Sequence, residues 1–98
     1  MMAIKLIKGQ AKGILGRREW WTVGNHTAVV AYGDERCGIC VLDESRRDFT
    51  REVVEKLRTI GNEPKLLQTI DSCLIECPLD QVSNFLIDIE AVLGSPQI

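Results

Sequence analysis

The stretch that decides the fold is WWTVGNHTAVVAYGDERCGICVL, residues 20–42. It contains three runs of β-branched and aromatic residues separated by turn residues. The pair Gly24-Asn25 between the first two runs is typical of a two-residue hairpin turn, and residues 33–36 suit a four-residue connection to the third run. The stretch therefore predicts a β-meander of three antiparallel strands, at residues 20–23, 28–32 and 37–42.

The hairpin turn also predicts which residues face one another and which share a side of the sheet. With Gly24-Asn25 at the turn centre, the opposed pairs are Val23 with His26, Trp21 with Ala28, and Trp20 with Val29. Because side chains alternate along a strand, residues two apart share a face. One face is the more apolar and is the better candidate for the core, and it extends to the third strand if Tyr32 lies opposite Cys37. This face carries Trp21, Val23, Ala28, Val30, Tyr32, Ile39 and Val41. The other face carries a mixed set: Arg18, Trp20, Thr22, Thr27, Val29 and Cys40.

Two helices are predicted after the meander. The first starts near Ser45, which forms a capping-box pattern with Asp48, and it stops at Gly61. Its apolar stripe is Phe49, Val53, Leu57 and Ile60. The second runs from a cap at Asp80 to a stop at Gly94 and Pro96. Its apolar stripe is Val82, Phe85, Leu86, Ile89 and Leu93.

Residues 65–77 fit either an amphipathic helix or a buried strand that ends at Pro78, and the strand is favoured. A short strand is also predicted at residues 3–8, followed by a loop containing Gly9, Gly13 and Gly16. Residues 1–98 are thus expected to form a single domain of the α+β class. It is a small two-layer domain, an antiparallel β-meander sheet with two helices packed on one face. The alternative is a β-hairpin sheet followed by three helices.

The amino-acid composition and the charge distribution exclude several classes of protein. The chain has 98 residues, 45% of them apolar and 27% charged, which excludes a disordered or collagen-like chain. The net charge of −2 is unevenly spread. Residues 1–19 hold five basic residues and one acidic residue, whereas residues 63–98 hold one basic residue and six acidic residues. The basic arm is too sparse to predict nucleic acid as the partner. With no secretory signal and no membrane-spanning run, a cytoplasmic protein with reduced thiols is expected.

Four cysteines form two close pairs in the sequence, Cys37 with Cys40 and Cys73 with Cys77. Their count and spacing permit a zinc site, but the favoured interpretation is four small buried residues and no metal. Cys37-Gly38-Ile39-Cys40 resembles, over four residues, the redox motif of thioredoxin-like proteins. That motif requires a helix after the first cysteine, whereas Val41 and Leu42 continue a strand. Thiol redox chemistry is therefore not expected.

Residues suited to catalysis are scarce. His26 is the only histidine, lies in a predicted turn and has no evident nucleophile beside it. The sequence therefore favours a non-enzymatic protein without catalytic residues or cofactor. Trp20 and Trp21 are adjacent, so one indole points away from the core, close to Arg17 and Arg18.

Aromatic and arginine side chains are enriched at interaction hot spots, so Trp20, Arg17 and Arg18 are the candidate partner-binding residues. We expect a small binding or regulatory module that contacts a protein partner and forms a homodimer through the Trp20 face or a sheet edge. Two alternatives remain open. One is a zinc-stabilised nucleic-acid-binding module, and the other is a small enzyme whose ligand lies between subunits.

Overall fold

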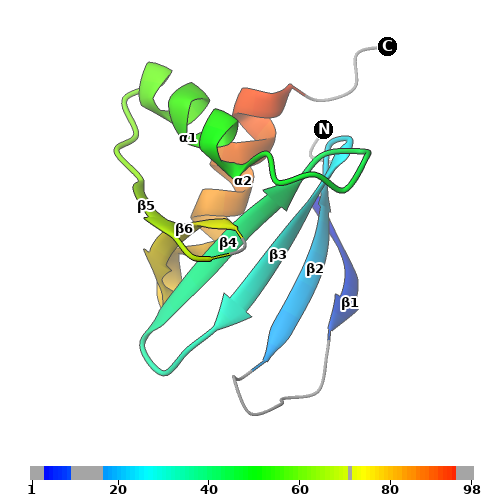
Figure 1. Cartoon of the computed structure of the whole chain (residues 1–98), viewed down its shortest axis with the longest axis vertical. Helices are drawn as coiled ribbons and strands as arrows, with labels where there is room; N and C mark the ends of the chain where they lie inside the picture. Colours follow the sequence, from blue (N-terminus) through cyan, green and yellow to red (C-terminus); the bar gives the residue numbers. More distant parts are fainter. Residues whose placement is uncertain (1–3, 10–16, 71, 95–98) are drawn as a thin grey trace.

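The computed structural model describes residues 4–9, 17–70 and 72–94. Six strands form one antiparallel sheet in the order β1-β2-β3-β4-β6-β5 (Figure 1). The strands are β1 (Ile4–Gly9), β2 (Arg18–Val23), β3 (His26–Tyr32), β4 (Arg36–Leu42), β5 (Lys65–Gln68) and β6 (Cys73–Pro78). The helices are α1 (Thr50–Thr59), the short 3₁₀ turn η1 (Leu79–Gln81) and α2 (Val82–Leu93).

The β-meander and its register are confirmed. Gly24 adopts a φ of 63°, a left-handed conformation that glycine reaches without steric cost, and β2 and β3 pair about this turn. The observed pairs are the predicted ones: Val23 with His26, Trp21 with Ala28, Trp20 with Val29, and Tyr32 with Cys37. The predicted N-terminal strand pairs with β2 as β1. The loop prediction is wrong for Gly9, which is the last residue of β1 and pairs with Glu19. The other two glycines of that prediction, Gly13 and Gly16, lie outside the described residues, as does Pro96.

Residues 65–77 form strands and not a helix, although they form two strands where one was expected. Strands β5 and β6 are joined where the Thr69 backbone N–H donates to the Ser72 carbonyl at 2.8 Å. Strand β6 then pairs with β4, placing Cys77 opposite Cys37 and Ile75 opposite Ile39. The sheet therefore continues past the meander, and β5 lies at its edge.

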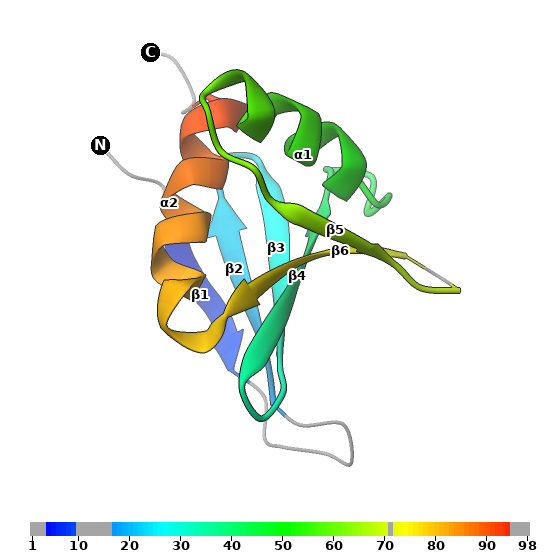
Figure 2. The ribbon, with the colours of Figure 1, turned by 90° about the vertical axis from the view of Figure 1, so that its left-hand side faces the viewer.

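Both helices pack on the same side of the sheet, which confirms the α+β two-layer class (Figures 1 and 2). The core between the layers contains the predicted sheet face together with residues from both helices and β6. Its fully buried members include Val23, Val30, Ile39, Val41, Val53, Leu57, Ile75, Leu86 and Ile89. The Cα radius of gyration is 12.6 Å, which is that of a compact chain of this length. In the described part of the chain, no helix is long and apolar enough to cross a membrane.

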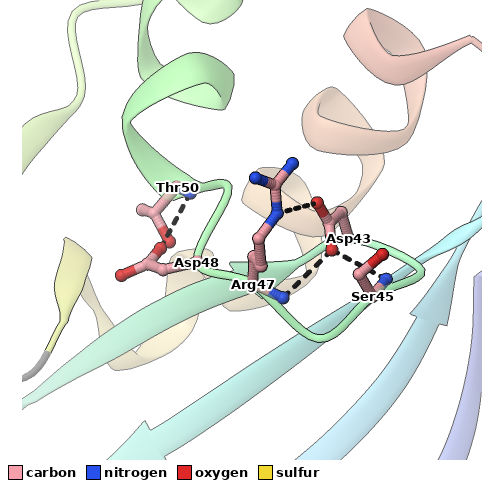
Figure 3. A network of polar contacts seen from close by, with 5 residues as sticks. All are labelled: Asp43, Ser45, Arg47, Asp48 and Thr50. Carbon is pink, nitrogen blue, oxygen red and sulfur yellow. Dashed lines mark hydrogen bonds and ion pairs between the residues drawn. The ribbon is translucent and has the colours of Figure 1, made fainter.

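The predicted capping box at Ser45 and Asp48 is wrong. Helix α1 begins at Thr50, and residues 43–48 form a tight connection in which Asp43 accepts hydrogen bonds from the Ser45 and Arg47 backbone N–H groups (Figure 3). Asp48 accepts from the Thr50 N–H at 2.9 Å, just before the helix. The Asp43 and Asp48 side chains thus stabilise the connection that precedes the helix.

Two further helix predictions are wrong. Asp80 is not a side-chain cap, because it lies within η1 and α2 begins at Val82 without any side-chain cap. Ile60 is not in the core: it follows the end of α1 and is 55% exposed. The predicted ends of both helices are confirmed, because Gly61 and Gly94 adopt left-handed φ values of 86° and 80°.

Candidate functional site

The side of the sheet opposite the helices is the candidate site, and we call it the open face. In β2–β4 it consists of the residues that alternate with the buried core positions: Arg18, Trp20, Thr22, Thr27, Val29, Ala31, Arg36, Gly38, Cys40 and Leu42. In β5 and β6 the same alternation adds Lys65, Leu67, Leu74 and Glu76. All but Arg18, Arg36 and Lys65 are half-buried. No described helix lies on this side (Figures 1 and 2).

An apolar band crosses the open face from β2 to β5. Its first part is a cross-strand row in which Trp20 pairs with Val29, and Val29 with Cys40. Its second part is the pair of Leu67 with Leu74. The Leu74 side chain lies over Gly38, because a Cβ built on Gly38 would be 3.1 Å from Leu74 Cδ1. The band thus continues over β4, where glycine leaves room for it.

Cations lie along one side of this apolar band, in the neighbouring cross-strand row that runs from Arg18 on β2 to Lys65 on β5. The Glu76 carboxylate lies between two of them, with Arg36 Nε at 3.0 Å and Lys65 Nζ at 3.5 Å. Arg18 is exposed on the same face, in the row where its Cα pairs with Ala31. Glu76 is the one acidic residue at the open-face positions of β2–β6, so these positions hold three basic residues and one acidic residue.

The three predicted partner-binding residues do not lie together. Trp20 and Arg18 share the open face, whereas Arg17 belongs to the other face, with its guanidinium carbon 4.3 Å from the centroid of the Tyr32 ring. Its Nε also lies 3.9 Å from Glu19 Oε2. Alternation along the strand separates neighbouring residues, so the pattern that assigned Trp20 to the outer face could also have separated Arg17 from Arg18.

A polar cluster around Tyr32 on the helix side was not expected from the sequence. The Tyr32 hydroxyl donates to Glu19 Oε1 at 2.7 Å, and the Trp21 indole N–H donates to the same oxygen at 3.3 Å. Burial, followed by the hydrogen bond to Glu19 and the negative charge of Glu19, raises the pKa of Tyr32 to about 12. The cluster therefore anchors the β2 and β3 ends and keeps Tyr32 protonated.

We predict that Tyr32 titrates well above an ordinary tyrosine. The chain has a single tyrosine, so its tyrosinate absorbance after a rapid pH jump reports Tyr32 alone. The midpoint should be about 12 in the folded protein and near 10 in urea, and Glu19→Gln should lower the folded value. Because the folded-state pKa is the higher one, the stability that Tyr32 contributes is complete below pH 10 and is lost as the pH rises to about 12. A folded midpoint near 10 would contradict the Tyr32–Glu19 contact.

The four cysteines pair differently in space than in sequence. Cys37 and Cys77 are directly opposed on β4 and β6, face the core, and are 4% and 0% exposed. Burial raises the pKa of both thiols, that of Cys77 to about 11, so they are protonated at neutral pH. In the residues that the structure describes, no three Cys, His, Asp or Glu side chains converge in a way that could hold a metal ion.

Cys40 and Cys73 belong to a junction between β4, β6 and the start of α1. Asp48 Oδ2 accepts a hydrogen bond from the Cys73 backbone N–H at 2.7 Å, and Thr50 Oγ1 lies 3.6 Å from Cys40 Sγ. Burial acts to raise the pKa of Asp48, but the hydrogen bonds from Thr50 and Cys73 outweigh it and hold the pKa below its usual value. Burial raises the pKa of the Cys40 thiol. The junction therefore stabilises the fold, and the Cys40 thiol is not an activated nucleophile.

His26 does not form a catalytic pair with any described residue. Its ring packs against Phe49 with the centroids 4.9 Å apart, and its Nδ1 is buried without a hydrogen-bond partner in the described structure. His26 is half-buried and is the first residue of β3, so its prediction as a turn residue is wrong. A histidine held against an aromatic ring without a neighbouring nucleophile fits a packing role.

The chain was compared with family models, curated proteins and solved structures, and none of the three comparisons finds a match. The class of protein is therefore assigned from the fold alone. The protein is a small two-layer α+β domain with one open sheet face.

Proposed function

We propose that this protein is a non-enzymatic interaction module whose open face binds an acidic, partly apolar segment of a partner protein. The observation that carries the proposal is the combination, on one face, of the apolar band and the cations beside it. Half-buried apolar side chains such as Trp20, Val29 and Leu74 lose further contact with water when a partner covers them, which favours binding.

The charge distribution determines the chemistry of the partner. Arg36 and Lys65 both contact Glu76, and the exposed Arg18 adds a third positive charge to the face. A partner with acidic residues next to apolar ones would complement both features. An acidic protein segment is favoured over nucleic acid because the cations are few and lie along one side of an apolar surface.

A direct test uses a fluorescein-labelled peptide of alternating glutamate and leucine and follows its anisotropy on addition of the whole chain. We expect saturable, salt-sensitive binding that Arg18→Glu and Val29→Glu each weaken by about tenfold or more. The matched control is Arg58→Glu, the same charge reversal at an exposed position of α1, which should leave binding within about twofold. Arg18 is exposed, so its replacement tests the face without disturbing the core.

Two further probes separate the possible outcomes. Labelled polyglutamate should bind more weakly than the mixed peptide, because it provides charge without apolar side chains. Labelled oligothymidylate should not bind at physiological salt. Oligothymidylate binding that Arg18→Glu abolishes would replace the protein partner with a nucleic acid, and equal effects of Arg18→Glu and Arg58→Glu would refute the open face as the site.

The proposal also includes a cytoplasmic location and a homodimer. The raised pKa values of the Cys37, Cys40 and Cys77 thiols support a non-enzymatic role, as does the packing of His26 against Phe49. The cysteines lie in two separate places with different neighbours, which supports this proposal over the zinc-dependent alternative.

A further inference from the structure

Helix α2 has an outer side that differs from that of α1. The exposed positions of α1 are those of a solvated helix, five of the six being charged: Arg51, Glu52, Glu55, Lys56, Arg58 and Thr59. The exposed positions of α2 carry no charge: Ser83, Asn84, Ile87 and Ala91. In a chain with 27% charged residues, an uncharged outer side over three helical turns indicates a surface that is covered in the working protein.

Three of the four exposed residues of α2 form a ridge at a spacing of four residues. Ser83, Ile87 and Ala91 are successive members, and Leu79 in the preceding 3₁₀ turn continues the spacing. Leu79 and Ile87 are 39% and 40% exposed, and both are among the few large apolar side chains that the described structure leaves exposed. Figure 2 shows α2 at the outside of the molecule, with no described element over its outer side.

The order of residue sizes along the ridge is the decisive feature. From residue 79 to residue 91 the ridge reads large, small, large, small. When the same ridge runs antiparallel beside itself, Leu79 meets Ala91 of the second copy, and Ser83 meets Ile87. Every large residue then lies opposite a small one, as close packing requires. The pattern is therefore complementary to its own reverse, which is the condition for a two-fold symmetric contact.

We infer that two copies of this chain associate through their α2 helices, packed antiparallel along the ridge Leu79, Ser83, Ile87 and Ala91. This contact is the surface of the homodimer in the proposed function, and it does not depend on partner binding by the open face. Antiparallel pairing brings no charged residue of either ridge against a like charge, and it aligns the two helix dipoles favourably. A single helix pair buries less area than a standard interface, so the dimer is expected to be weak and concentration-dependent.

Sedimentation analysis of the whole chain over a wide concentration range tests this pairing through a size swap. Ser83→Ile alone places isoleucine against isoleucine, and Ile87→Ser alone places serine against serine, so each should weaken the dimer by about tenfold or more. The double variant S83I/I87S exchanges the two and restores large against small, so its dissociation constant should return to within about threefold of the original. Both positions are exposed, so the monomer fold is not changed, as circular dichroism can verify.

The remaining variants separate the possible failures. Ile87→Glu should abolish the dimer, whereas Lys56→Glu on the outer side of α1 should have no effect. A chain that stays monomeric at millimolar concentration overturns the homodimer itself. A dimer that survives Ile87→Glu and is lost in Val29→Glu overturns the α2 surface and assigns the contact to the open face. A double variant as weak as either single variant overturns the antiparallel register.

Discussion

Leu57→Ala should destabilise the protein by about 2–5 kcal/mol, a large fraction of the free energy of unfolding of a small domain. Leu57 lies in α1, is 0% exposed and is one of the largest fully buried side chains. Its truncation removes apolar surface from the interface between the helices and the sheet and leaves a cavity that the surrounding β4 and β6 side chains cannot fill without moving. Urea denaturation monitored by circular dichroism gives the free energy of unfolding.

The matched control is Ile60→Ala. The sequence places Leu57 and Ile60 in the same apolar stripe, and the structure separates them, because Ile60 follows the end of α1 and is 55% exposed. Its truncation should change the free energy of unfolding by about 0.5 kcal/mol or less. Equal costs for the two substitutions would show that α1 packs on the sheet with a different face.

Thr50→Val should cost about 1–3 kcal/mol although it hardly changes the side-chain volume. Thr50 is 0% exposed at the start of α1, and its Oγ1 accepts a hydrogen bond from the Val41 backbone N–H at 2.8 Å. Valine removes this acceptor and leaves a buried N–H at the end of β4 without a partner. The expected result is a lower midpoint of urea denaturation with an unchanged slope.

Two variants define the cause of this loss. Thr50→Ser keeps the hydroxyl and should retain most of the stability that Thr50→Val removes. Thr59→Val makes the same chemical change at the exposed end of α1, where the hydroxyl donates only to the Lys56 carbonyl, and should cost about 0.5 kcal/mol or less. If Thr50→Val and Thr59→Val were equally mild, the hydrogen bond to Val41 would not join α1 to β4 in solution.

The open face was partly predictable. Alternation along β2 correctly separates Trp20 from Trp21, because it depends only on the geometry of a strand. The same alternation puts Arg17 and Arg18 on opposite faces, so grouping both with Trp20 overlooked a signal that the sequence contains. Leu67, Leu74 and the Arg36–Glu76–Lys65 contacts could not be predicted, since they depend on β6 pairing with β4.

The sequence by itself determined the local features of this protein: the β2–β3 register, the two faces of the meander, and the helix stops at Gly61 and Gly94. Each depends on backbone conformations within a few residues, which turn and glycine chemistry specify directly. The tertiary structure alone decided that β6 lies beside β4, that Cys37 opposes Cys77, and that α1 begins at Thr50. These features bring together residues that are distant in the chain. Local sequence patterns permit several strand pairings, and the one observed is selected because it buries a single shared apolar core.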